Sequence, residues 1–304
     1  MKNFNVSRLA YLSFAFLALS ACTTDNGNEK QVKESTVPVP QNDTETPKNW
    51  RLVWQDEFDM EQIDSDKWSY EVNCAGGGNE EQQCYTKSNK NAYVDSGVLH
   101  IEAIKGDVTG PKLHDDEPGY DPSVTKSQPY SSARLRTKNL GDWKYGRFEI
   151  RAQLPAGQGI WPAIWMLPTD WVYGGWPASG EIDIMEAVNL KTLSDDPDAV
   201  EGTLEARVHG TLHYGPKWPD NIYTGKSYTL ENQLNPADDF HEYAIEWEEG
   251  EIRWYVDDIH YSTQTSETWY SQTKNENGKL ISNGEFAPFD QRFHLILNLA
   301  VGGN

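Results

Sequence analysis

From Trp50 onward, apolar side chains recur at every second position in short runs. Examples are Leu52/Trp54, Tyr93 with Val98 to Ile101, Phe148/Ile150, Tyr243/Ile245/Trp247, Ile252/Trp254/Val256 and Phe293/Leu295/Leu297. Turn-forming clusters such as DSG, EEGE and NGE separate the runs, and long helical periodicity is nearly absent. Many short strands without intervening helices predict an all-β fold, an antiparallel sandwich or barrel with one accessible face.

The start of the chain has the features of an export signal. Lys2 and Arg8 form a short basic region, and residues 9–19 form an apolar run shorter than the roughly 20 residues that span a bilayer. The sequence LSAC that closes this region resembles a bacterial lipobox, which is cleaved before its cysteine. We therefore expect a signal peptide over residues 1–21 and a lipid on Cys22, which would anchor the protein to the bacterial cell envelope, facing the periplasm or the cell surface. An ordinary signal peptide is the alternative.

The next segment differs sharply in composition from the rest. Residues 23–49 contain only three Val as aliphatic residues and are otherwise rich in Thr, Asn, Pro and charge. Such a stretch buries too little apolar surface to offset the entropy of ordering it. We expect residues 22–49 to form a disordered tether and residues 50–304 to form one folded domain, a length common among all-β domains.

Once Cys22 is set aside, Cys74 and Cys84 remain as an even pair. In an oxidising compartment such a pair favours a disulfide. Two free thiols are the alternative, since spacing alone does not give the geometry.

The chain is strongly acidic, with 26 Lys and Arg against 47 Asp and Glu. Without Lys2 and Arg8 the mature chain carries a formal charge of −23. This charge argues against nucleic acid, anionic lipid and anionic polysaccharide as partners, because like charges repel. A neutral polymer remains compatible.

The segment GWPASGEIDIMEAV carries the candidate chemistry. In a strand, Ile182 and Ile184 would be buried while Glu181 and Asp183 point to the opposite face. Glu186 lies at an odd offset from Glu181, so it would face the core unless one extra residue bulges near Ile184 or Met185. With such a bulge, three carboxyl groups line one face.

Two carboxyl groups on one face suit glycoside hydrolysis with retention. One attacks the anomeric carbon while the other protonates the leaving oxygen, at a separation of about 5 to 5.5 Å. A third acid can raise the pKa of the proton donor by like-charge repulsion. An acidic solvent face on an ordinary strand is the alternative, but it does not explain the parity of Glu186. Tryptophans at positions 161, 165, 171 and 176 precede the motif, and their flat faces suit sugar rings.

The motif EIDIME resembles the catalytic signature of glycoside hydrolase family 16 in its bulged form. The surrounding segments resemble the laminarinase (endo-β-1,3-glucanase) branch of that family. They are LVWQDEFD, GGGNEEQQCYT, SARLRT, YGRFEIRAQLPAGQGIWPAIWMLP, GGWPASGEIDIMEAV, GTLHYG and FHLILNLAVGGN. The resemblance covers nearly all of residues 51–304 and implies a concanavalin-like jelly roll with a concave substrate cleft.

The resemblance also implies roles for individual residues. Glu181 would be the nucleophile, Asp183 its helper and Glu186 the acid/base. The residues expected to bind or line the path of the sugar are Asn79, Arg134, Trp161, Trp165, Trp176 and His213. For the polar members of this set, structural roles are the alternatives: a left-handed turn residue after three glycines for Asn79, a surface ion pair for Arg134 and a satisfied structural histidine near a sheet edge for His213.

The sequence departs from the family in several places. Residues 106–130 and 189–208 are longer than usual and could reshape the cleft ends. The cysteine pair is unusual, and the chain stops at NLAVGGN, where relatives continue through a final strand that supplies an acidic calcium ligand. We therefore expect a truncated sandwich of marginal stability, in which the missing strand weighs against a structural calcium ion. No other metal is assigned.

These observations predict an endo-acting, retaining hydrolase of β-1,3-glucosidic bonds in laminarin-type glucans. We expect a monomer that needs no cofactor for catalysis, contacts a membrane only through its lipid and binds no nucleic acid. The alternatives are a family 16 enzyme that acts on mixed-linkage glucan or galactan, or an inactive glucan-binding fragment.

Overall fold

The computed structural model describes residues 50–303 of the chain. The predicted signal peptide, the lipidated Cys22 and the tether lie outside the described residues. Within the described range nearly all regular structure is β-strand, and the one helix is the short 3-10 turn Glu231–Gln233. No helix in this part of the chain is long and apolar enough to cross a membrane. The all-β prediction is confirmed.

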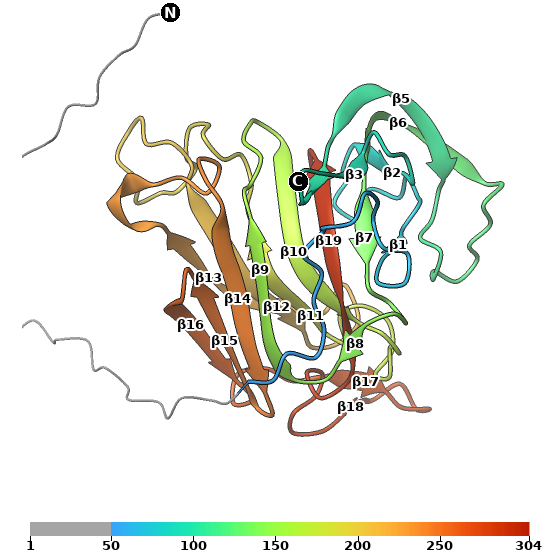
Figure 1. The fold of residues 1–304 in the computed structure, drawn as a ribbon. Helices are drawn as coiled ribbons and strands as arrows, with labels where there is room; N and C mark the ends of the chain where they lie inside the picture. The colour runs from blue at the N-terminus through green and yellow to red at the C-terminus, as the bar shows by residue number, and fades with distance from the viewer. Residues whose placement is uncertain (1–49, 304) are drawn as a thin grey trace, which may run out of the picture. The chain divides into compact units, whose positions relative to one another are not determined.

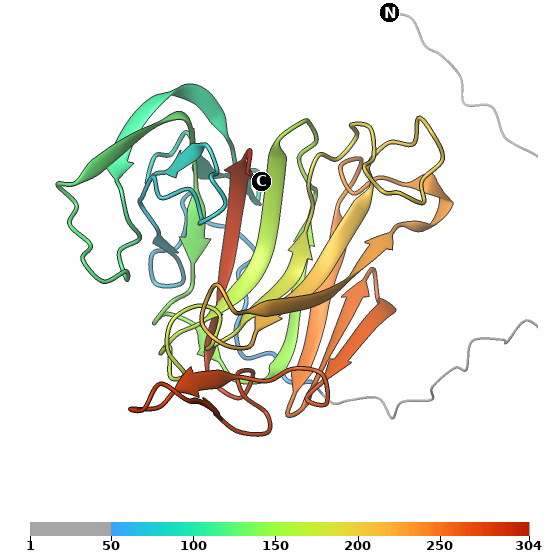
Figure 2. The ribbon, with the colours of Figure 1, turned by 180° about the vertical axis from the view of Figure 1, so that it is seen from behind.

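Two antiparallel sheets stack face to face, as Figures 1 and 2 show from opposite sides. The larger sheet has the order β1 (Ser69–Tyr70), β7 (Arg134–Arg136), β19 (Phe293–Val301), β10 (Ile160–Pro168), β11 (Glu181–Glu186), β12 (Arg207–Tyr214) and β13 (Ile222–Thr229), with β8 (Asp142–Trp143) pairing β19. The smaller sheet has the order β16 (Ile259–Thr265), β15 (Glu251–Val256), β14 (His241–Glu248) and β9 (Gly146–Ala152). The fold is a β-sandwich, and Figure 2 presents the outer face of the larger sheet.

Three small sheets complete the described part. They are β2 (Gln83–Tyr85), β6 (Thr125–Ser132) and β5 (Ile104–Pro111); β3 (Ala92–Asp95) and β4 (Val98–Ile101); and β17 (Gln272–Lys274) and β18 (Leu280–Ser282). The long segment 106–130 thus consists of parts of β5 and β6 and of the loop 112–124 that connects them. The 189–208 segment is largely irregular and is closed by a bridge between Leu193 and Leu204.

The core between the two sheets forms from the alternating apolar positions of the sequence. Ile182 and Ile184 from the larger sheet and Ile252 and Trp254 from the smaller sheet are all essentially buried. Gly210 on β12 is required by this packing, because a Cβ there would lie 2.4 Å from the ring of Trp254. The core therefore holds the middle of β11 and β12 against a large, rigid side chain.

Two segments differ from the simple alternating pattern. Residues 51–59 were expected to contain a strand, but no strand is assigned there. Trp54 instead packs edge-on against Trp68 and Trp143, with ring centroids 5.7 and 5.4 Å away. All nine residues of β19 are buried. The strand pairs with β10 along one edge and with β7 along the other, and both of its faces are covered.

Candidate active site

The three acids of the EIDIME motif occupy the central strand β11. Asp183 pairs with Trp165 of β10 and Thr211 of β12, while Glu186 pairs with Ala163 and His209. The register shifts between these pairs, so β11 has one more residue than either neighbour across the stretch 183–186. This is the β-bulge predicted from the parity of Glu186, and it lies at Ile184 and Met185 as expected.

The bulge places apolar and acidic side chains on opposite sides of the sheet. Ile182, Ile184 and Met185 are at most 2% exposed and belong to the core. The indole of Trp254, on the core side, donates a hydrogen bond of 2.8 Å to the backbone oxygen of Asp183. The carbonyl group that precedes the bulge is thus satisfied from within the core, which fixes the local backbone.

Burial and mutual repulsion raise the pKa values of all three acids. Burial is the largest cause for each, and for Glu181 the charge of Asp183 adds to it, which raises the Glu181 pKa to about 7. The pKa of Glu186 rises well above its usual range, because it is buried close to both Asp183 and Glu181. The pKa of Asp183 is also raised by burial. The raised pKa of Glu186 favours its protonated form, as a general acid requires.

His213 provides the positive charge beside these acids. It pairs with Glu181 across β11 and β12, and its Nε2 lies 3.6 Å from Glu181 Oε1 and 3.4 Å from Asp183 Oδ2. Burial alone would lower the pKa of the imidazole, but Asp183 and Glu181 outweigh it and raise that pKa to about 9. The protonated ring in turn stabilises the ionised forms of Asp183 and Glu181.

Two tryptophans hold the two outer acids directly. The indole of Trp176 donates to Glu181 Oε2 at 2.9 Å, and the indole of Trp161 donates to Glu186 Oε1 at 3.0 Å. Trp161 therefore contacts an acid as closely as Trp176 does. Each hydrogen bond limits the rotation of a carboxyl group and leaves its second oxygen available.

Trp165 and Arg134 form a stacked pair on the side of β19. The guanidinium of Arg134 lies 4.6 Å from the centre of the Trp165 ring, and its Nε lies 3.1 Å from Glu71. The Trp165 indole donates to Asn298 Oδ1 at 2.7 Å, and Asn298 donates to the hydroxyl of Tyr85 at 3.1 Å. Arg134 is thus an ion-pair partner, as in the alternative, but the pair is buried and not on the surface, and Arg134 also lies against a site tryptophan.

Asn79 lies on an exposed loop at the end of the site near Trp161. A Cβ on Gly303 would lie 2.8 Å from the Trp161 ring and 3.6 Å from the backbone oxygen of Asn79, so the three residues meet. Asn79 is not the left-handed turn residue of this loop, since that conformation is adopted by Glu80 with a φ of 59°. The loop is braced by a disulfide between Cys74 and Cys84.

Sequence reasoning missed several residues of the site. Asn298 and Tyr85 fix Trp165, Glu71 neutralises Arg134, and Tyr223 lies 5.6 Å from the ring of His213. Asn298 left a signal, because it is a polar residue in the middle of the apolar strand FHLILNLAV. The partnership of Glu71 with Arg134 spans 63 positions and left no local signal.

The acids also raise the question of a metal ion. Among the described residues, Glu181, Asp183 and His213 are the group whose ligand atoms lie within 4.8 Å of one another. Calcium prefers six to eight oxygen ligands, and a protonated imidazole offers none. The cluster therefore does not suit calcium.

Comparison with known proteins gives consistent matches. The family described as Glycosyl hydrolases family 16 matches residues 79–279. "Beta-glucanase" of Rhodothermus marinus is 43% identical over 259 residues, covering 84% of this chain and 77% of that protein. "Glucan endo-1,3-beta-glucosidase A1" of Niallia circulans is 41% identical over 261 residues, covering 83% of this chain and 34% of that protein, so the chain spans about a third of its length. The X-ray structure of the laminarinase from Rhodothermus marinus superposes with a TM-score of 0.61 at 41% identity, covering 84% of this chain and 87% of that one.

Proposed function

The chain belongs to glycosyl hydrolases family 16, and from this premise we propose that it hydrolyses β-1,3-glucosidic bonds within glucan chains, with retention of configuration. The observation that carries the proposal is the bulge in β11. It brings the off-parity Glu186 to the same face as Glu181 and Asp183, next to a tryptophan donor. An acidic strand without catalytic use would not need this irregularity.

The proposed roles follow from the environments of the acids. Glu181 attacks the anomeric carbon while Glu186 donates its proton to the leaving oxygen, and Glu186 then removes a proton from the water that releases the sugar. Glu186 suits the acid role because its pKa is the one raised furthest above the usual range. Glu181 suits the nucleophile role because His213 favours its ionised form, opposing the effect of burial. Asp183, between them, supports the proton on Glu186 by repulsion.

The tryptophans and the polar residues around the acids would bind the sugar chain. Trp161, Trp165 and Trp176 offer rings and bonded N–H groups close to the acids, and Arg134 and Asn79 lie toward the β7 and β19 side. For the substrate, support comes from the relatives named as β-1,3-glucan hydrolases. Mixed-linkage glucan and galactan are the alternative substrates within the family. A binding module without activity is less well supported, since all three acids are present and their pKa values are raised.

The proposal is tested by incubating the protein with laminarin, lichenan and agarose and sizing the products. We expect short oligosaccharides from laminarin early in the reaction, as an endo-acting enzyme gives. Glu181→Gln should lower the rate by more than about a hundredfold, beyond what loss of positioning alone gives. Binding of laminarin by this variant should persist, because a nucleophile contributes more to the transition state than to ground-state affinity. Equal or faster cleavage of agarose would assign the enzyme to galactan.

The remaining features of the proposal rest on the sequence alone. We propose that Cys22 carries a lipid that anchors a monomeric enzyme to the cell envelope and that hydrolysis requires no cofactor. The lipobox-like LSAC supports the anchor. A carboxylate pair completes the reaction without a metal, which supports the lack of a cofactor requirement.

A further inference from the structure

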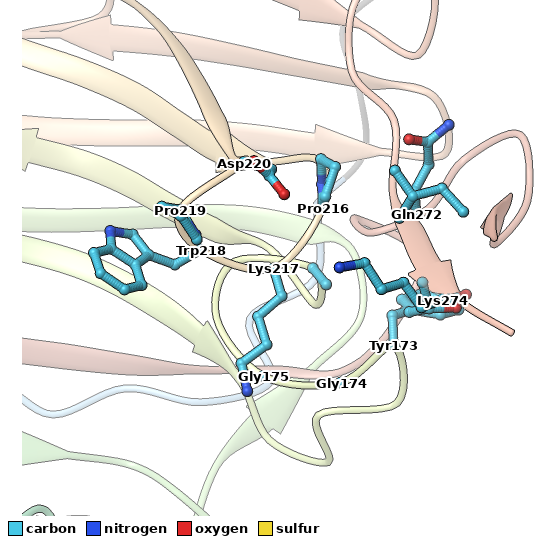
Figure 3. A pocket seen from close by; sticks show the side chains of 13 residues that line it. Tyr173, Gly174, Gly175, Pro216, Lys217, Trp218, Pro219, Asp220, Gln272 and Lys274 are labelled. Carbon is cyan, nitrogen blue, oxygen red and sulfur yellow. The ribbon is translucent and has the colours of Figure 1, made fainter. Parts of the chain in front are cut away.

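A cavity of about 270 Å³ lies close to the three acids, and none of the acids lines it. Its walls come from three segments: residues 173–175 and 178 before β11, residues 216–220 between β12 and β13, and residues 272–274 and 280 of the β17–β18 hairpin. Figure 3 shows these segments facing one another. The volume is slightly below the range of about 300 to 1,000 Å³ for small-molecule sites, so it suits one sugar unit rather than a chain.

The cavity adjoins the segment that carries Trp176. Its residue Gly175 immediately precedes Trp176, the tryptophan that donates to Glu181. The backbone N–H of Trp218 donates to the backbone oxygen of Trp176 at 3.3 Å. A ligand in this cavity would therefore lie next to the segment whose Trp176 donates a hydrogen bond to Glu181.

Backbone hydrogen bonds hold the walls in place. Gly215 N–H donates to Tyr270 at 3.0 Å, and Gln272 N–H donates to Gly215 at 3.4 Å, which ties the 216–220 loop to the hairpin. The hydroxyl of Ser271 donates to the backbone oxygen of Ala178, which ties the hairpin to the third wall. The cavity is thus a formed feature of the fold.

The lining combines hydrogen-bond donors, acceptors and apolar rings. Lys217 and Lys274 supply ammonium donors, Asp220 supplies a carboxylate acceptor, and Gln272 supplies an amide. Neither lysine takes part in an ion pair with another residue of the described range. In Figure 3 the side chain of Lys274 reaches from β17 toward the 216–220 loop. Lys217 packs along Gly175, where a Cβ would lie 3.4 Å from its Cε.

Exposed aromatic rings lie next to the cavity. Trp218 is 67% exposed, and in Figure 3 its indole lies on the other side of the 216–220 loop from Lys274. Tyr223, which is 70% exposed, is the cross-strand partner of His213, so rings follow one another from Trp176 through His213 to Tyr223 at the edge of the sheet. Large exposed rings of this kind mark binding surfaces.

We propose that this cavity, with Trp218 at its rim, is an accessory site for a neutral hexose unit of the polysaccharide that is being cleaved. Hydroxyl groups both donate and accept, so a hexose uses the lysines, Asp220 and Gln272 together. An anionic sugar would meet Asp220 as well as the two lysines, and the overall negative charge of the chain disfavours its approach. The hexose can come from two sources, a side branch on the glucan or a unit of the main chain beyond the cleaved bond. This inference rests on the proposed function.

The first test compares kinetics on two substrates for Trp218→Ala and Lys274→Ala. The substrates are a linear β-1,3-glucan oligosaccharide and laminarin that carries β-1,6-linked glucose branches, and Lys279→Ala on the same hairpin is the matched control. We expect KM to rise at least fivefold with kcat nearly unchanged in the first two variants, and no change in the control. A rise on the branched substrate alone assigns a side branch, whereas a rise on both assigns a main-chain unit. Unchanged KM values on both substrates would overturn the proposal.

The second test measures binding without hydrolysis, so that it remains decisive even if no β-1,3-glucan is cleaved. Gentiobiose, two glucose units joined by a β-1,6 bond, is titrated into the full protein by calorimetry. We expect saturable binding that weakens at least fivefold in Trp218→Ala and Lys274→Ala and is unaltered in Lys279→Ala, with all melting temperatures equal. Lack of binding by the unmodified protein, or tighter binding of glucose 6-sulfate than of gentiobiose, would refute a neutral-hexose site.

Discussion

At the scale of single residues, the site depends on how differently two glutamates on one strand are placed. Glu186 is held by Trp161 and repelled by both other acids, whereas Glu181 is held by Trp176 and faces the cation of His213. The pKa of Glu186 is therefore raised well above its usual range and that of Glu181 to about 7, where the charge of His213 offsets part of the effect of burial and of Asp183. This division matches the acid and nucleophile roles of a retaining mechanism.

Removal of Glu186 should be rescued by an external nucleophile. Glu186→Ala should slow the cleavage of glucan severely, because the leaving oxygen then departs without a proton. On an activated aryl glycoside, whose leaving group needs no proton, added azide should restore turnover and give a glycosyl azide of β configuration, detectable by NMR. An α-azide would show instead that Glu186 is the nucleophile and that the two roles are exchanged.

Asp183 should set the pH range of activity. Burial contributes most to the raised pKa values of Glu186 and Glu181, and the charge of Asp183 comes next. Asp183→Asn removes that charge, so both pKa values fall and Glu186 loses its proton at lower pH. The alkaline limb of the kcat/KM profile should move down by about one pH unit. Asp121→Asn, at an exposed position, is the control. An unmoved alkaline limb in the Asp183 variant would exclude this electrostatic role.

Individual residues were predictable where the chain itself carried a pattern. The acids and the tryptophans lie close together in sequence, and the structure brings them together at β10 and β11. Asn298, Glu71 and Tyr85 were missed, because they reach the site from distant strands and act through Trp165 and Arg134. The pairing of each tryptophan with one acid through a hydrogen bond depends on loop conformation. The alternation of apolar residues does not predict that conformation.

At the scale of secondary-structure elements, one irregular strand makes the site. The bulge in β11 lies opposite Gly210 on β12, and Trp254 fills the space left by the missing side chain while bonding to Asp183 from the core side. The smaller sheet thus supports the irregular backbone of the larger one. The geometry of the acids and the packing of the core are therefore linked.

Changing the length of β11 should show this link. Insertion of one Ala between Ile184 and Met185 makes the offset from Glu181 to Glu186 even, so regular alternation would keep Glu186 on the acid face but place it about 7 Å farther along β11. Activity should fall at least hundredfold, because the general acid is then out of reach of the leaving oxygen. Deletion of Met185 should remove the bulge and restore regular alternation, so the acids stay on one face and more activity survives. The deletion should still destabilise the fold, because it removes a buried side chain. Activity that falls equally in both variants, with matched melting temperatures, would contradict this account.

The elements themselves were predicted unevenly. The alternation of apolar and polar residues predicted the positions of β9, β14 and β15 well, because each of these strands turns one face toward the core. It failed for residues 51–59, where a tryptophan cluster rather than strand pairing holds the chain, and it could not show that β19 is covered on both faces. Which strands become neighbours, such as β19 beside β10, depends on contacts that span more than a hundred positions.

At the scale of the whole molecule, the net charge of the chain is consistent with an uncharged substrate. The chain carries a net charge of −21, and its proposed substrate is neutral. The positive groups near the acids, Arg134 and His213, are both engaged with carboxylates. An acidic surface does not impede the approach of an uncharged glucan, but it repels anionic polymers.

The final prediction concerns the link between the enzyme and the cell. If Cys22 carries a lipid, Cys22→Ala should move the protein from the membrane fraction to the soluble fraction, since the apolar run at the start is too short to span a bilayer. The specific activity on laminarin should not change, because Cys22 lies outside the sequence segments that carry the site. Fractionation and activity assays are done on the same samples, with Ser20→Ala as a control that leaves the cysteine intact. If the Cys22 variant stays in the membrane fraction, the lipid is not what anchors the enzyme.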